Sequence, residues 1–191
     1  MHLEFKKINL ARDYGVCVAA RRDAYVCSFH RNEGFDEFLA GYRERMATRL
    51  TSQEWHYLHV WQGDEIVGQL EFCTVSAEPE TGYIYLIYLT PQARGQGMAD
   101  LLLQYIGRTL RHAGCRRVVL SVSRLNLRAL RFYLRCGWQY RGPNPKHAET
   151  DFYEYWLPDP ALSVAVFERE KQSLMEGKID GSETGPGIGC R

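Results

Sequence analysis

A glycine-bearing loop stands between an apolar run and a helical pattern, with the sequence Arg94-Gly95-Gln96-Gly97-Met98-Ala99. Its small residues leave the backbone accessible, and the free N–H groups at the start of a helix bind anions. Arg94 adds a charged donor. The loop therefore suits a pyrophosphate, and the alternative is a tight strand-to-helix turn that holds no ligand.

Two common phosphate motifs do not fit this loop. A P-loop needs Gly-x-x-x-x-Gly-Lys-Ser/Thr, which the chain lacks, and a dinucleotide fingerprint needs Gly-x-Gly-x-x-Gly/Ala. The last position of that fingerprint is Asp100 here, and an aspartate would repel a pyrophosphate. The loop is therefore not typical of a P-loop or of a Rossmann site.

The elements around the loop follow from hydrophobic periodicity and from turn residues. Strands are predicted over 3–8, 55–61, 65–75, 83–89, 118–122, 138–141 and 152–157, and helices over 13–29, 35–50, 98–110, 126–135 and 161–175. Strands 83–89 and 118–122 are joined through a helix, so they should be parallel, while the hairpins on either side should be antiparallel. We expect an α/β (α+β) fold with a mixed sheet and helices on both faces.

Composition places the chain among globular proteins. It has 191 residues, of which 45% are hydrophobic and 25% charged, which argues against a fully disordered chain. No apolar run approaches the length of a membrane span, and residues 1–5 lack the apolar core of a signal peptide. None of the six cysteines forms a Cys-x-x-Cys pair, so we expect reduced thiols and a cytoplasmic protein with no membrane partner.

Charge is unevenly distributed. The net charge is +1, yet residues 101–148 hold ten Lys or Arg and no Asp or Glu. Such a block favours an anionic partner, and the alternative is a solvated surface whose acidic partners lie elsewhere in the fold. The arginines fall on several elements without a known nucleic-acid motif, so nucleic-acid binding is the less favoured hypothesis.

Two motifs in register resemble those of the GNAT superfamily, the acetyl-CoA-dependent N-acetyltransferases. Arg94, Gly97 and Ala99 fill the family pattern Arg/Gln-x-x-Gly-x-Gly/Ala. The stretch Asn126-x-x-Ala129-x-x-Phe132-Tyr133, followed by Cys136-Gly137-Trp138, is similar to a second family helix and its ending. The resemblance covers roughly 3–157 and implies a mostly antiparallel sheet with one splayed parallel strand pair.

The resemblance also implies where acetyl-CoA would lie. The pantetheine would pair with the strand backbone from Ile87 to Leu89, and the pyrophosphate would sit on the amides of Gly95, Gln96, Gly97, Met98 and Ala99. Asn126, Ala129 and Phe132 would complete the cofactor side, with no metal. Arg128, Arg131 or Arg135 could reach the phosphates of this polyanion. The domain would span 1–158, followed by a helix within 159–176 and a flexible tail at 177–191.

The chemistry implied is attack of a primary amine on the acetyl thioester. Tyr133 is the candidate acid for the departing thiolate, because Asn126, Ala129 and Tyr133 share one helix face; the alternative is a core tyrosine. A base must deprotonate the amine. Glu71 is our candidate, Glu80 is a second one, and a water chain or an amine of low pKa would remove the need.

The acceptor should approach from the side of the two N-terminal helices. Acidic Glu33, Asp36 and Glu37 and the aromatics nearby would suit a cationic amine of a small molecule or a peptide; the alternative is that the aromatics are core and the acids solvated. Those aromatics are Tyr25, Phe29, Phe35, Phe38 and Tyr42. The last two strands are compatible with a homodimer. A competing hypothesis keeps the fold without catalysis, as an acyl-CoA-binding module.

Overall fold

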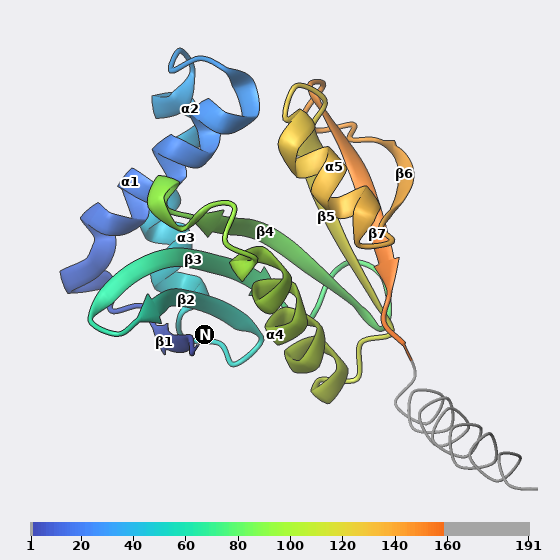
Figure 1. The fold of residues 1–191 in the computed structure, drawn as a ribbon, viewed down its shortest axis with the longest axis horizontal. Helices are drawn as coiled ribbons and strands as arrows, with labels where there is room; N and C mark the ends of the chain where they lie inside the picture. The colour runs from blue at the N-terminus through green and yellow to red at the C-terminus, as the bar shows by residue number, and fades with distance from the viewer. Residues whose placement is uncertain (1, 159–191) are drawn as a thin grey trace, which may run out of the picture. The chain divides into compact units, whose positions relative to one another are not determined.

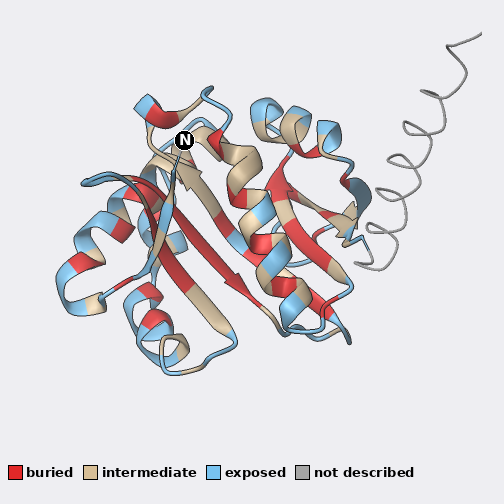
Figure 2. Cartoon of the chain, turned by 60° about the horizontal axis from the view of Figure 1, so that its bottom comes forward, coloured by how far each residue is buried: buried red, intermediate tan, exposed pale blue. Residues whose placement is uncertain are grey.

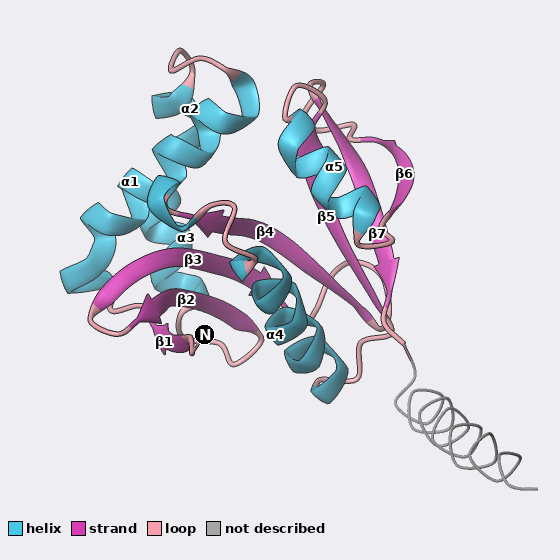
Figure 3. Cartoon of the chain, in the orientation of Figure 1, coloured by secondary structure: helices cyan, strands magenta, loops and turns pink. Residues whose placement is uncertain are grey.

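The computed structural model describes residues 2–158, so the helix expected within 159–176 and the tail expected at 177–191 lie outside the described residues. Seven strands form one sheet in the order β1-β2-β3-β4-β5-β7-β6 (Figure 3). The strands are β1 (Glu4–Lys7), β2 (Trp55–Gln62), β3 (Glu65–Cys73), β4 (Thr81–Leu89), β5 (Arg117–Ser123), β6 (Gln139–Pro143) and β7 (Thr150–Trp156). Every neighbouring pair is antiparallel except β4 and β5, which run parallel as predicted.

Helices cover both faces of this sheet. They are α1 (Leu10–Phe29), α2 (Phe35–Leu39), α3 (Tyr42–Arg49), α4 (Met98–His112) and α5 (Leu127–Arg135), with a 3-10 turn at Pro91–Ala93. α1 starts earlier than predicted because Asn9 caps it. The Asn9 side chain accepts a hydrogen bond from the Ala11 amide at 3.0 Å, and Asp13 accepts one from the Asn9 amide at 2.9 Å. This reciprocal pairing satisfies amides that a helix start leaves free.

The single helix predicted over 35–50 is wrong, because the chain breaks into α2 and α3. Ala40 is extended (ψ 130°) and Gly41 is left-handed (φ 67°), a conformation that glycine adopts without steric cost. Leu39, Tyr42 and Met46 nevertheless pack in one hydrophobic cluster. The periodic spacing of these residues therefore indicates that they are buried on the same side, although they do not belong to one continuous helix.

Two hydrophobic clusters lie on opposite faces of the sheet, whose strands are largely buried (Figure 2). On one face, Leu102 and Ile106 of α4 pack against strand residues such as Phe72. On the other face, α1 and α3 pack over the sheet through a cluster that includes Cys17, Tyr42, Met46 and Tyr57. We call these the α4 face and the α1/α3 face.

A β-bulge in β4 begins the separation of β4 from β5. Adjacent residues of β3 face Leu86 and Ile84, which leaves Tyr85 as the extra residue of β4. A bulge bends its strand and increases the local twist. β4 pairs with β5 only from Thr81 to Ile84, and the two strands diverge beyond that point (Figure 1). The splayed strand pair that the sequence led us to expect is therefore present.

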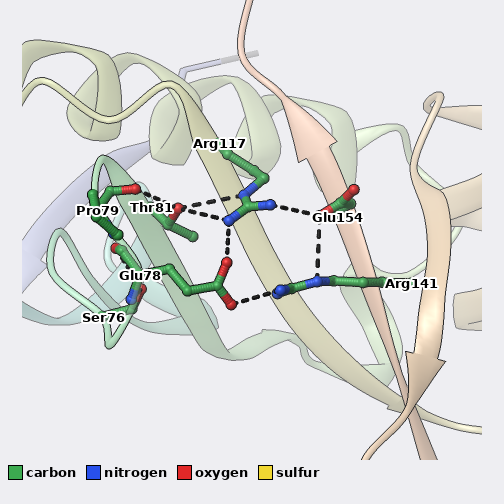
Figure 4. Close-up of polar contacts among 7 residues, drawn as sticks. All are labelled: Ser76, Glu78, Pro79, Thr81, Arg117, Arg141 and Glu154. Atoms are coloured by element: carbon green, nitrogen blue, oxygen red, sulfur yellow. Dashed lines mark hydrogen bonds and ion pairs between the residues drawn. The ribbon is translucent and has the colours of Figure 1, made fainter.

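Four charged side chains hold the end at which β4 and β5 still pair (Figure 4). Arg117 of β5 forms ion pairs with Glu78, in the loop before β4, and with Glu154 of β7 at 3.2 Å. Arg141 of β6 forms ion pairs with Glu78 at 2.6 Å and with Glu154 at 3.5 Å. We call these four residues the ion-pair cluster; it fixes the base from which the strands diverge.

Candidate functional site

The glycine loop leads into α4 with its backbone exposed. Gly95 and Gly97 are left-handed, with φ of 82° and 78°, which a residue with a side chain adopts only at a cost. Gly97 directly precedes α4, and no side chain of the described residues caps this helix. The first amides of α4, starting at Met98 and Ala99, thus lack intrahelical acceptors. They form a site suited to a phosphate group.

Arg94 is engaged by the protein itself. Its Nε donates to the Leu89 carbonyl at 3.0 Å, and its guanidinium forms an ion pair with Asp23 of α1. These contacts fasten the end of β4 and the glycine loop to α1. The charged donor expected at Arg94 thus has protein partners of its own, the Leu89 carbonyl and Asp23.

Arg128 of α5 lies beside the glycine loop. A Cβ built on Gly95 would come within 4.0 Å of its Nη2 atom. Arg135, another candidate from the sequence, is paired with Asp100 of α4 at 3.3 Å. Position therefore favours Arg128 as the charged partner of an anion bound at the loop.

One edge of β4 is open where the strands diverge. Leu89 and Ile87 face Gly68 and Leu70 of β3, while pairing of β4 with β5 stops at Ile84. The backbone from Tyr85 to Leu89 has no strand partner on the β5 side among the described residues. An open strand edge offers N–H and C=O groups to an extended ligand.

α5 lies along the β5 side of the gap. Asn126 caps the helix, accepting a hydrogen bond from the Ala129 amide at 3.1 Å. Tyr133 is buried, and its ring packs 5.4 Å from that of Trp138. The Tyr133 hydroxyl makes no hydrogen bond with a described residue. Burial raises the pKa of Tyr133, so the phenol remains protonated over the physiological pH range.

Glu71 lies on the α1/α3 face and is completely buried, with 0% exposure. Its carboxylate accepts hydrogen bonds from Arg21 at 3.0 Å, from the Tyr42 hydroxyl at 2.5 Å and from Gln69 at 2.7 Å. A second Arg21 nitrogen completes a bidentate ion pair. These contacts do not favour Glu71 as a general base, because both oxygens are engaged and water cannot reach them. Glu80, the second candidate, faces Arg116 at 3.6 Å in the loop before β4.

The aromatic residues of the N-terminal helices pack mostly on one another. Tyr25, Phe35 and Tyr42 are buried, and the ring of Tyr25 lies 5.2 Å from that of Phe38, which is partly exposed. The Asp36 carboxylate is exposed and pairs with Arg22 at 3.4 Å. The core alternative for these aromatics is therefore largely confirmed.

The C-terminal end of α1 reaches across to the other half of the sheet. Arg31 forms a bidentate ion pair with Glu149, which precedes β7, at 2.8 and 2.6 Å. A ring nitrogen of His30 contacts the Leu125 carbonyl at 3.2 Å. These contacts join the end of α1 to the segments before α5 and β7. They lie at the end of the sheet where β4 and β5 are separated. Sequence spacing gave no signal for them, because the partners lie about a hundred residues apart.

Several arginines of the basic block have acidic partners in the fold. Ion pairs are formed by Arg116, Arg117, Arg124, Arg135 and Arg141.

No helix in the described part of the chain is long and apolar enough to cross a membrane. Within residues 2–158, no cluster of His, Cys, Asp and Glu has the arrangement of a metal site.

Comparison with known sequences points to one family. The sequence profile described as "Acetyltransferase (GNAT) family" matches residues 19–138. A mycothiol acetyltransferase of Corynebacterium glutamicum (strain R) is 31% identical over 114 residues, which are 56% of this chain and 38% of that protein. The chain thus spans well under half the length of this relative.

Solved structures with the same fold include complexes with coenzyme A. A PaiA N-acetyltransferase of Thermoplasma acidophilum, bound to coenzyme A, has a TM-score of 0.69 at 15% identity, over 82% of this chain and 99% of that one. A spermidine N-acetyltransferase of Vibrio cholerae, bound to CoA and spermine, has a TM-score of 0.59 at 16% identity, over 81% and 95%. At these identities the likeness is one of fold.

Proposed function

The chain belongs to the GNAT family of acetyltransferases, and from this premise we propose that it transfers an acetyl group from acetyl-CoA directly to a primary amine. One observation carries the proposal: β4 and β5 diverge beyond Ile84, and the uncapped start of α4 lies next to the diverging strands. The gap gives an extended thioester an open strand edge, and the helix start gives its pyrophosphate free amides.

In this proposal, residues on both sides of the gap bind the cofactor. We assign the pantetheine to the open edge of β4 around Ile87 and Leu89, and the pyrophosphate to the amides of Gly95, Gln96, Gly97, Met98 and Ala99. Asn126, Ala129 and Phe132 lie on α5, along the other side of the gap. Arg128, beside Gly95, supplies positive charge that a polyanion attracts.

The reaction needs three groups around the thioester. The amine nitrogen forms a bond to the acetyl carbon, the C–S bond breaks, and the thiolate takes up a proton. We assign the last proton to Tyr133, whose raised pKa keeps it protonated well above neutral pH. A backbone N–H near Leu89 would stabilise charge on the carbonyl oxygen. Since Glu71 is engaged by Arg21, we propose that water or an acceptor of low pKa takes the place of a carboxylate base.

The engagement of Glu71 favours a second candidate, an acyl-CoA-binding module without catalysis. Both candidates predict cofactor binding, and only the enzyme predicts turnover. Tyr133→Phe should leave acetyl-CoA binding unchanged and lower kcat by about a hundredfold, a usual contribution of a positioned acid. Exposed Tyr140 provides a matched Tyr→Phe control with unchanged kcat.

The experiment measures thermal stability with acetyl-CoA, NAD or a short RNA at fixed salt, and then turnover with a panel of amines. Acetyl-CoA at a hundred times its dissociation constant should stabilise the fold by about 2.7 kcal/mol, a shift of several degrees. No shift with acetyl-CoA, or a shift with RNA alone, would contradict the proposal. A shift without turnover of any amine would identify the binding module instead.

A further inference from the structure

Arg49, the last residue of α3, is a half-buried arginine that forms no ion pair with an acidic residue in the described part of the chain. Its Nη1 donates to the Tyr57 hydroxyl at 3.1 Å, and its guanidinium carbon lies 3.8 Å from the ring centroid of Trp55. None of the ion pairs among residues 2–158 includes Arg49. By contrast, Arg21 and Arg94, whose side chains are largely buried, each form an ion pair with a carboxylate. Arg49 therefore has no acidic partner among the described residues, and its guanidinium N–H donors are available to an anionic group of a ligand.

Arg49 lies next to the point where β4 leaves β5. Its guanidinium carbon is 5.0 Å from the ring centroid of Tyr85, the bulge residue. Trp55 packs with the cluster of α1 and α3, so this contact is on the α1/α3 face. α4, whose start we assign to the pyrophosphate, packs on the other face. Arg49 is thus on the face from which an acceptor would approach.

Four aromatic rings continue from Arg49 across β2, β4 and β7. Ring centroids are 5.1 Å apart for Trp55 and Tyr85, 4.6 Å for Tyr85 and Tyr83, and 6.5 Å for Tyr83 and Phe152 of β7. We call these four residues the aromatic stripe. Burial raises the pKa of Tyr85 to about 12, so its phenol is neutral at physiological pH. Arg49 supplies a positive charge at one end of an otherwise uncharged aromatic surface.

We infer that Arg49 binds a carboxylate of the acceptor, so that the substrates are primary amines that also carry a carboxylate; this rests on the proposed function. A guanidinium has five N–H donors in a planar fork that matches a carboxylate, and only one of them is bonded to a described side chain. Stacking on Trp55 holds the fork in place. A polyamine without an acidic group would bring only positive charge to this face, and Arg49 would repel it.

The test compares amines that differ only in the carboxylate. We would measure kcat/KM of the full chain for L-phenylalanine, β-alanine and γ-aminobutyrate, each beside its primary amide, with spermine as a cationic acceptor. The free acids should be preferred over their amides by about tenfold to a hundredfold, as expected for a charge-assisted bidentate contact. Arg49→Gln should bring that preference close to one, mainly through KM of the acids.

Matched variants separate this role from effects on folding. Arg49→Lys keeps the charge but loses the planar fork, so its preference for acids over amides should be intermediate. If Arg49→Gln does not fold, Arg49→Lys still tests the inference. Arg43→Gln, an exposed arginine of the same helix, should retain the wild-type preference. Acetyl-CoA should stabilise every folded variant equally; failure of that shift in the wild type would overturn the proposed function itself. If acetyl-CoA does stabilise the wild type, three results would overturn the inference. These are a preference for amides or spermine over the acids, a preference that Arg49→Gln leaves unchanged, and no acetylation of any acid.

Discussion

Glu71 and Tyr133 are both buried ionisable residues, but their surroundings differ in the number of partners. Arg21, Tyr42 and Gln69 donate hydrogen bonds to the Glu71 carboxylate, whereas the Tyr133 hydroxyl has no partner among the described residues. A proton donor must exchange its partner during the reaction, so an unengaged hydroxyl suits that role better than a carboxylate held in an ion pair. For these two residues, the number of hydrogen-bond partners separates the candidate proton donor from the structural carboxylate, whereas burial does not.

Glu71→Gln tests whether the Glu71 carboxylate is structural. The substitution leaves Arg21 buried without its counter-charge, so the free energy of unfolding should fall by about 3–5 kcal/mol. Urea denaturation monitored by circular dichroism measures this. The double variant Arg21→Gln/Glu71→Gln removes both charges and should recover part of the loss. A fully stable Glu71→Gln protein with a hundredfold lower kcat would instead support Glu71 as the base.

At the scale of elements, the sequence predicted the order of strands and helices and the parallel pair, because these follow from periodicity and connection length. It did not predict the bulge at Tyr85, since every residue from Tyr83 to Leu89 is apolar or aromatic and none marks an extra position. It also missed the break at Gly41. Gly114 and Gly137 follow α4 and α5 at points where the apolar pattern stops as well, whereas around Gly41 the pattern continues.

For the candidate site, too, the sequence predicts features formed by neighbouring residues and misses contacts between distant ones. The glycine loop and the face of α5 were found because their residues are close in sequence, and a local motif carries the signal. The contacts of Arg49, of Asp23 with Arg94, and of Arg128 with the glycine loop join elements far apart in the chain. Such contacts depend on how the helices pack on the sheet, which no local pattern records.

A substitution at Gly68 of β3 tests how closely the backbones of β3 and β4 are packed. A Cβ at this position would lie 2.4 Å from the Tyr88 carbonyl oxygen, so Gly68→Ala must shift backbone. The free energy of unfolding should fall by about 1–3 kcal/mol, as measured by urea denaturation. Gly15→Ala in α1 is the matched control, because its Cβ meets open space; it should stabilise by about 0.5–1 kcal/mol. A Gly68→Ala protein as stable as the wild type would contradict this account.

On the scale of the whole molecule, two sets of contacts hold the diverging halves together. The ion-pair cluster fixes the base, and the contacts of Arg31 and His30 join the opposite end. The ion-pair cluster and the Arg31–Glu149 pair depend on ionised carboxylates. Hydrogen bonds from Arg141 lower the pKa of Glu78, and those from Arg31 lower the pKa of Glu149.

The fold should therefore lose stability in acid. A carboxyl whose pKa is lower in the folded than in the unfolded state stabilises above its unfolded pKa of about 4.3, and this contribution is lost as the pH falls through the folded value. Melting temperatures recorded from neutral pH down to about pH 3 should fall most steeply below pH 4.3. Glu78→Gln should flatten this dependence, whereas Glu65→Gln, at an exposed position of β3, should retain it. Parallel curves for Glu78→Gln and the wild type would argue against the cluster as the cause.

α1 is fastened to both helix starts that face the gap. Asp23 holds Arg94 of the loop before α4, and Ser28 and His30 contact the segment that leads into α5. α1 therefore contacts both the loop to which we assign the pyrophosphate and the start of α5. If either ligand repositions α1, thermodynamic reciprocity requires that acetyl-CoA changes the affinity for the amine by the same factor as the amine changes the affinity for acetyl-CoA.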